Sequence, residues 1–299
     1  MSRIMKIMGL NGSSFAPLLL GFGCSVPAIL STRRIETRSD RLVTIAVLPM
    51  MSCAGRLPIY MMFVSALFPS RLQAPVLFGI YASGVLLALC CARLLKNTLF
   101  KAPQRDSLHH MKRLRLPSLR KVGILMWSRA FMYVRKAGTF ILGASIILWF
   151  LNTYPRPEEN TAPTNAAAME HSYAGQIGHW MEPVTQVAGF DWKINSALVG
   201  AFAAKEIFVT QMGILYAVED GNSVPAAQQT LNARLKASYT PLQGISIMIF
   251  CLIALPCIGT VTVAKREAGT WWFALAQFGG LTLLGFATAT LIYQAGLLL

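Results

Sequence analysis

Long apolar blocks separated by short polar segments are the feature that most constrains how this chain can fold. Each block has about twenty residues or more, the length that a helix needs to cross a bilayer core of roughly 30 Å. The chain of 299 residues is 55% hydrophobic and only 13% charged, whereas a soluble domain has about 25% charged residues. We therefore predict an all-α, polytopic membrane protein, and soluble enzyme classes fit poorly. The blocks cover residues 42–68, 74–95, 137–154, 194–218, 242–264 and 271–298.

The charged residues are distributed unevenly between the polar segments. Between Arg93 and Lys136 the chain has twelve Lys and Arg residues against one acidic residue, a balance of +11. Between Pro155 and Lys193 it has two basic and five acidic residues, a balance of −3. Lys and Arg are retained in the cytoplasmic loops of membrane proteins. We therefore predict that residues 93–136 form a basic amphipathic segment at the cytoplasmic face, that the acidic loop 155–191 is external, and that nucleic acid is not a partner.

Three apolar segments each combine a cysteine with helix-breaking residues. Cys24 is followed by Pro27, Cys53 lies between a proline and a glycine, and Cys257 directly follows Pro256. Breaks in a membrane helix leave backbone carbonyls unpaired, and the unwound stretch can present these carbonyls together with a thiolate to a cation. Thiolates are soft ligands that suit transition metals. The alternative is that cysteine serves as a small packing residue at a simple kink, and the sequence leaves both interpretations open.

Ionisable residues also occur inside the apolar segments, at Arg56, Lys205 and Glu206. Charges at membrane depth are costly and usually face a cavity or an oppositely charged partner. These residues are therefore candidates for a gating pair or a cation-attracting carboxylate, with a local ion pair as the alternative. We also predict that residues 194–218 form a re-entrant hairpin, because a full crossing would place the basic pair Lys265-Arg266 outside.

Motifs for nucleotide binding and metal-dependent hydrolysis do not occur in the sequence. The chain has no GxxxxGK[ST] phosphate-binding loop and no HExxH zinc motif. His171 and His179, in the acidic loop, are weak candidates for a metal site. We therefore predict no enzymatic activity and no nucleotide site in this chain.

Motifs in nearly the whole chain, in the right order, resemble the transmembrane region of the ferrous iron transport protein B (FeoB) family. The first gate region of that family is similar to Gly9–Phe15, Pro17–Leu19, Gly21–Cys24, Val26–Ile29, Thr32-Arg33, Asp40–Leu42, Pro49, Ser52-Cys53 and Arg56–Pro58. The second gate is similar to Gly189–Trp192, Ala197-Leu198 and Gly200–Glu206, and the terminal block to Pro256-Cys257, Arg266-Glu267, Gly269 and Trp271.

The resemblance implies a fold of two inverted-topology gate repeats that carry Fe²⁺ through the inner membrane. Residues 1–92 are then the remainder of the first repeat, residues 93–136 the basic cytoplasmic segment, and residues 137–299 the second repeat. Fe²⁺ is expected as the transported substrate and not as a resident cofactor. The residues expected along the iron path are Cys24, Cys53 and Cys257, and those expected to take part in gating are Arg56, Lys205, Glu206, Pro27 and Pro256.

The sequence departs from the family pattern at its beginning. Family members usually begin with a cytoplasmic GTPase domain and several membrane helices, whereas Met1 corresponds to a position inside the first gate repeat. A split system with a separate GTPase subunit, a truncated gene and a misassigned start are the explanations. The leading hypothesis is the permease part of a ferrous iron importer that works with a separate GTPase-bearing subunit, and a homo-oligomer is also compatible. The alternatives are a nucleoside-type gate transporter and a non-transporting remnant or assembly subunit.

Overall fold

The computed structural model describes residues 12–100, 118–155, 170–217, 224–254 and 256–298. Within these residues all regular secondary structure is helical, as the composition predicts. Four helical stretches are long and apolar enough to cross a membrane, and two of them contain an internal break. The four stretches are Arg38–Leu67, Ser70–Thr98, Pro241–Ala268 and Trp271–Leu298.

The first half of the chain forms a short hairpin, a broken helix and a long continuous helix. The hairpin packs α2 (Phe15–Gly21) against α3 (Ser25–Ser31). The broken helix ends its first part where Pro49, which lacks a backbone N–H, enters the chain. Its parts, and the helices that flank it, are η2 (Thr32–Arg34), α4 (Arg38–Val47), η3 (Leu48–Met50), η4 (Ala54–Arg56), α5 (Leu57–Leu67) and α6 (Ser70–Thr98).

The second half of the chain repeats this order. Its hairpin consists of α10 (Trp192–Ala203) and α11 (Glu206–Ala217), which pack against each other across a break at Ala204-Lys205, as the re-entrant hairpin predicts. After α12 (Val224–Ser238) the broken helix follows as α13 (Pro241–Ile253) and α14 (Ile258–Ala268). The continuous helix is α15 (Trp271–Leu298). The same sequence of hairpin, broken helix and continuous helix in both halves is the arrangement expected of gate repeats.

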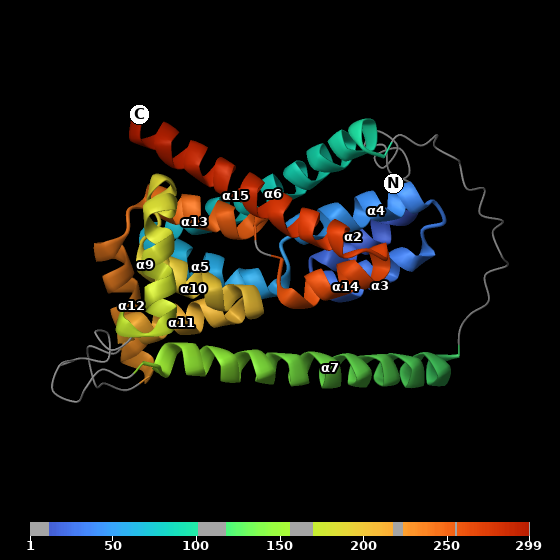
Figure 1. The fold of residues 1–299 in the computed structure, drawn as a ribbon, viewed down its shortest axis with the longest axis horizontal. Coiled ribbons are helices and arrows are strands. Elements are labelled where there is room, and N and C mark those ends of the chain that lie inside the picture. The colour runs from blue at the N-terminus through green and yellow to red at the C-terminus, as the bar shows by residue number, and fades with distance from the viewer. Residues whose placement is uncertain (1–11, 101–117, 156–169, 218–223, 255, 299) are drawn as a thin grey trace.

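The two halves interlock at their centre. Figure 1 shows that α4 and α14 lie at one end of the molecule and α5 and α13 at the other, so each broken helix contributes one part to each end. α3 packs against α14 at the first end, and α5 packs against α11 and α12 at the second. The first end carries many basic residues, and we call it the basic end. Its basic residues are Arg33, Arg34, Arg38, Arg41, Lys96, Lys265 and Arg266.

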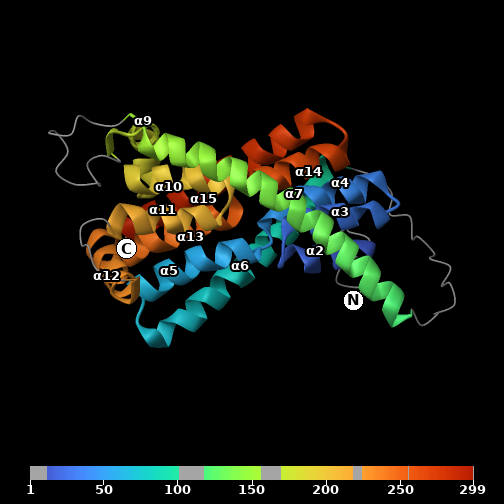
Figure 2. The same cartoon turned by 90° about the horizontal axis from the view of Figure 1, so that it is seen from below.

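Helix α7 (Leu119–Thr153) lies along one side of this bundle, opposite the crossing of α6 and α15 (Figures 1 and 2). It unites the described part of the predicted amphipathic segment and the predicted span 137–154 in one helix of 35 residues. The predicted boundary at residue 136 therefore falls inside α7, because a change from basic to apolar composition does not interrupt backbone hydrogen bonding. Residues 101–117 of the basic segment lie outside the described residues. At its far end α7 meets α9 (Tyr173–Thr185), which is followed by η5 (Gln186–Ala188).

Large apolar side chains on the outer helices face away from the bundle. Leu86 and Leu94 of α6 are about two-thirds exposed, and the same is true of Leu283 and Leu291 of α15. A surface of this kind is unfavourable in water and is the normal outer surface of a membrane protein. The polar Gln277 of α15 instead points inward, where its Nε2 donates to the carbonyl of Ile45 at 2.7 Å.

Candidate functional site at the helix breaks

The breaks of both hairpins and both broken helices meet in one region. The backbone N–H of Ala54 donates to the carbonyl of Gly23 at 3.1 Å, which joins the first broken helix to the first hairpin. Arg56 joins the two broken helices: its Nη1 donates to Met51 O at 3.1 Å and its Nη2 lies 3.5 Å from Ala254 O. These contacts bring together three segments that sequence reasoning treated separately.

The second hairpin reaches the same region through Gly55. A Cβ atom at Gly55 would lie 2.6 Å from Glu206 Oε1 and 3.7 Å from the Cβ of Lys205. Only a residue without a side chain allows this approach without displacing the carboxylate of Glu206. The break at Ala204-Lys205 is therefore in contact with the break that contains Cys53.

The three predicted path cysteines occupy equivalent local positions. Cys24 is the N-cap residue of α3, Cys53 that of η4 and Cys257 that of α14, and all three have extended backbone conformations. An N-cap side chain lies beside the unpaired N–H groups of the first helical turn, which favour negative charge. All three cysteines are half-buried, whereas Cys251 is buried and Cys90 is exposed. The Sγ of Cys257 is 3.1 Å from the Oγ1 of Thr260.

The prolines and the charged residues of the site differ in burial. Pro256 is buried in the link between α13 and α14, and Pro27 is half-buried in the first turn of α3, where its missing N–H has no helical partner to lose. Arg56 is only 1% exposed and Lys205 only 7%, whereas Glu206 is exposed. Within the described part of the chain no ion pair joins Lys205 to Glu206, so the local ion pair proposed as their alternative role is not formed here.

The site contains no preformed cluster of metal ligands within the described ranges. In these ranges, no group of three or more His, Cys, Asp and Glu side chains is close enough to hold one metal ion. The candidate ligands are therefore thiols on separate helix starts, together with backbone carbonyls at the breaks. His179 lies elsewhere: it stacks on Trp192 at 4.9 Å, and its two ring nitrogens face Glu182 at 3.1 Å and Glu170 at 3.5 Å.

Sequence reasoning missed an ionic network at the basic end. The carboxylate of Glu267, on α14, accepts hydrogen bonds from Arg33 Nε at 2.9 Å and Arg33 Nη2 at 2.5 Å. It also accepts a hydrogen bond from Arg41 Nη2 at 2.7 Å. Nearby, the buried Lys96 of α6 pairs with the buried Asp40 of α4. The available signal was that Glu267 is an isolated acid directly after Lys265-Arg266, but nothing in the sequence indicated which arginines it meets.

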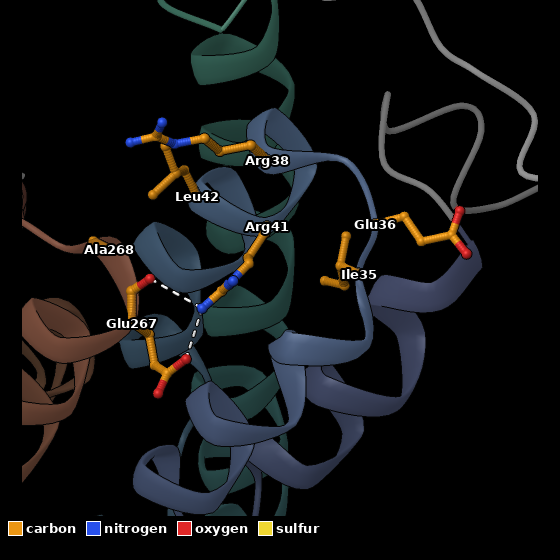
Figure 3. A pocket seen from close by; sticks show the side chains of 7 residues that line it. All are labelled: Ile35, Glu36, Arg38, Arg41, Leu42, Glu267 and Ala268. Carbon is orange, nitrogen blue, oxygen red and sulfur yellow. Dashed lines mark hydrogen bonds and ion pairs between the residues drawn. The ribbon is translucent and has the colours of Figure 1, made fainter.

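A pocket of about 330 Å³ opens beside this network, as Figure 3 shows. Arg41 points across it toward the carboxylate and the backbone carbonyl of Glu267, whereas Glu36 points away. The pocket lies at the basic end and not at the helix breaks. Its lining residues are Ile35, Glu36, Arg38, Arg41, Leu42, Glu267 and Ala268.

A second polar network lies at the end of the molecule opposite the basic end. Asp191 caps α10 by accepting the N–H of Ile194 at 2.9 Å, and its other oxygen accepts the hydroxyl of Tyr239 at 2.8 Å. Burial raises the pKa of the Asp191 carboxyl, and the two hydrogen bonds oppose that rise. The Nζ of Lys193 lies 4.6 Å from the ring centre of Tyr216, whose hydroxyl donates to Tyr239.

Two known protein families match this chain. The family described as "Gate: Nucleoside recognition" matches residues 1–67 and 134–271. The family described as "Ferrous iron transport protein B C terminus" matches residues 77–129. Between them these matches cover both hairpins and both broken helices. They include no GTPase domain.

Individual relatives agree with the family matches. The chain is 38% identical to "Fe(2+) transporter FeoB" of Campylobacter jejuni, over 92% of this chain and 45% of that protein. It is 37% identical to "Fe(2+) transport protein A/Fe(2+) transporter FeoB fusion protein" of Porphyromonas gingivalis, over 100% of this chain and 39% of that protein. It is 35% identical to the Staphylococcus aureus "Fe(2+) transporter FeoB", over 99% of this chain and 42% of that protein.

The chain therefore spans less than half the length of each of these three relatives. No solved structure is significantly similar to it. The resemblance read from the sequence motifs is nevertheless confirmed, and so is the helical gate architecture with long apolar helices. This chain is a multi-pass protein of the cytoplasmic membrane that belongs to the FeoB family, of which it represents the transmembrane gate region.

Proposed function

We propose that this chain is the permease part of a ferrous iron uptake transporter and that Fe²⁺ passes through the region where the helix breaks meet. The observation that carries the proposal is the convergence of three Cys-bearing breaks with the break at Lys205. The hydrogen bonds Ala54 N–Gly23 O and Arg56 Nη1–Met51 O, with the approach of Glu206 to Gly55, bring these segments together. A meeting of unwound segments at the interface of two repeats is where transporters bind their substrates.

The chemistry of the proposed path suits a borderline-soft divalent ion. Cys24, Cys53 and Cys257 supply sulfur ligands, and backbone carbonyls freed at the breaks supply oxygen ligands in place of water. Because these ligands are not gathered into one cage, Fe²⁺ would be held by few of them at a time and with modest affinity. Modest affinity is what transport requires, since an ion that binds too tightly is not released.

The two buried cations have a defined role in this proposal. Arg56 and Lys205 are buried where the breaks meet, and their positive charge repels a metal ion there. The path therefore conducts only when sulfur or carboxylate ligands compensate for this repulsion. The exposed carboxylate of Glu206, beside Gly55, is placed to attract the cation, and Pro27 and Pro256 maintain the breaks on which the site depends.

A separate subunit completes the transporter in this proposal. The relatives named as Fe(2+) transporters are more than twice as long as this chain. We infer that the GTPase and the remaining membrane helices are supplied by another chain. Residues 1–92 then complete the first repeat with that subunit, residues 93–136 face the cytoplasm, residues 137–299 form the second repeat, and the acidic loop 155–191 is external.

Cysteine substitution tests the proposed path. Serine removes the soft ligand while nearly preserving the side-chain volume, so a packing role would tolerate it with little loss. We expect Cys24→Ser or Cys257→Ser to lower uptake of radioactive ferrous iron about tenfold or more in cells that also produce the partner subunit. Protein amounts in the membrane are measured in parallel.

The chain provides its own matched controls at the exposed Cys90 and the buried Cys251. Cys90→Ser and Cys251→Ser should leave uptake within about twofold of the starting protein. Equal loss of uptake at all four positions, or no loss at any of them, would favour a packing role for the cysteines.

A nucleoside transporter is the second candidate, because the larger family match carries the description "Nucleoside recognition". A nucleoside site would use amide, carboxylate and aromatic contacts and would not need thiols at three helix starts. Uptake of labelled nucleoside that is insensitive to the cysteine substitutions would favour this candidate. A protein that transports neither substrate, even with its partner, would be a remnant or an assembly subunit.

A further inference from the structure

The ionic network at the basic end joins the two repeats of the molecule. Arg33 and Arg41 belong to the first repeat, on η2 and α4, and Glu267 belongs to the last turn of α14 in the second repeat. The Glu267 side chain is only 2% exposed, whereas that of Arg33 is 54% exposed and that of Arg41 is 28% exposed. Arg41 additionally donates to the backbone carbonyl of Glu267 at 3.0 Å. One buried carboxylate is therefore held by two arginines that have access to water.

The network lies at one end of a helix pair whose other end is formed by two of the helix breaks. α3 and α14 pack against each other, and each begins at a break, with Cys24 and Cys257 as their N-cap residues. Near the breaks, Val26 comes close to Gly259, whose Cβ would lie 3.5 Å from the Cγ2 of Val26. At the other end of the same interface lie Arg33 and Glu267. The ion pairs therefore hold α3 and α14 together at the basic end, at the opposite end of these helices from the breaks.

The corresponding interface at the other end of the molecule is held together by contacts of a different kind. There α5 packs against α11 and α12, and the contact is aromatic. The ring of Phe63 lies 6.1 Å from that of Phe208 and 6.3 Å from that of Tyr239, and all three side chains are buried. Apolar packing of this kind separates only when large buried surfaces are exposed, whereas the arginines at the basic end already contact water.

We propose that Glu267, Arg33 and Arg41 form an ionic gate that closes the route between the helix breaks and the basic end of the molecule. When α3 and α14 separate, the carboxylate and the guanidinium groups exchange their mutual hydrogen bonds for water. This exchange makes the open state accessible, because hydration recovers much of what the broken ion pairs lose. The gate depends on the proposed path, but it concerns access to the breaks and not the identity of the transported ion.

Accessibility of Cys257 provides the test. In a chain whose other five cysteines are replaced by serine, Cys257 is labelled with a membrane-impermeant maleimide added to one face of sealed vesicles at a time. We expect Glu267→Gln and Arg33→Gln each to raise the labelling rate from the face that carries the basic end by about tenfold. This is the effect of losing a contact as strong as one hydrogen bond to a charged group from the closed state.

Arg34→Gln is the matched control, because Arg34 neighbours Arg33, is also exposed and loses the same charge. It should leave the labelling rate unchanged. Raising the salt concentration should increase labelling of the unsubstituted network, since partly exposed ion pairs are screened, and should have little further effect on Glu267→Gln.

Two results would overturn the gate. One is unchanged labelling in both Glu267→Gln and Arg33→Gln. The other is an equal rise from both faces of the vesicle, which would indicate general loosening of the fold. Because the readout does not depend on iron, a failure of iron uptake leaves this result interpretable, and the reverse also holds.

Discussion

The contact between α15 and the break of the second broken helix provides a quantitative test of the structure. Gly285 of α15 is buried against Ala254, the C-cap residue of α13. A Cβ at Gly285 would lie 2.8 Å from the Cβ, 3.1 Å from the N and 3.3 Å from the Cα of Ala254. None of these atoms belongs to a flexible side chain, so Gly285→Ala must displace the backbone that carries the carbonyl facing Arg56.

Gly280→Ala is the matched control, because a Cβ at Gly280 would have no atom within 4 Å. Alanine in place of glycine favours a helix by about 1 kcal/mol at either position. Overpacking a tight contact costs about 1–3 kcal/mol. The stability difference between the two variants removes the helix-propensity term and should equal the cost of overpacking.

Thermal unfolding in detergent measures this difference. A domain of about this size changes its Tm by roughly 2–4 °C per kcal/mol. Gly285→Ala should therefore unfold about 2–12 °C below Gly280→Ala, and Gly280→Ala should unfold at or above the temperature of the unsubstituted chain. If the two variants unfold at the same temperature, α15 does not cross the break at Ala254 as closely as described.

Two further predictions concern the ends of the molecule. Burial raises the pKa of Asp191, so the folded state binds its proton more tightly than the unfolded state; this contribution to stability is present at low pH and lost as pH rises from about 4 through the raised pKa. Asp191→Asn keeps a good N-cap residue and should abolish this part of the pH dependence. The unfolding free energy of the unsubstituted chain minus that of Asp191→Asn should therefore fall as pH rises, and a difference that stays constant or rises would contradict the assignment. For the topology, a cysteine replacing the exposed Arg266 should react with an impermeant maleimide only from the cytoplasmic face and one replacing Glu182 only from the external face; the reverse pattern would refute the orientation.

The sequence alone determined the class of the protein and the location of most breaks. Pro49 and Pro256 interrupt helices through a local effect, the loss of a backbone N–H, that needs no knowledge of the neighbouring helices. The balance of charges likewise predicted that Lys265-Arg266 lies on the cytoplasmic side of the membrane. In the structure this pair lies at the basic end together with Arg33, which is 234 positions away from its partner Glu267.

Composition changes near residue 136 without interrupting the helix. This change separated the basic segment 93–136 from the span 137–154 in the sequence, whereas residues Leu119–Thr153, taken from both, form one helix, α7. Composition determines which solvent surrounds a helix, whereas its continuity depends on backbone hydrogen bonds. Nothing at Lys136 or Ala137 removes a donor or clashes with the preceding turn, so the helix continues.

Only the tertiary structure decided which helix faces meet. In a membrane protein the face toward lipid and the face toward the core are both apolar, so hydrophobic periodicity does not mark the buried side. The apolar 18-residue windows of α6 and α15 have only 17% of their residues buried inside the bundle. Consequently, the meeting of the four breaks, the contact of Arg56 with both broken helices and the choice of Arg33 and Arg41 as partners of Glu267 all depend on how two distant repeats pack together.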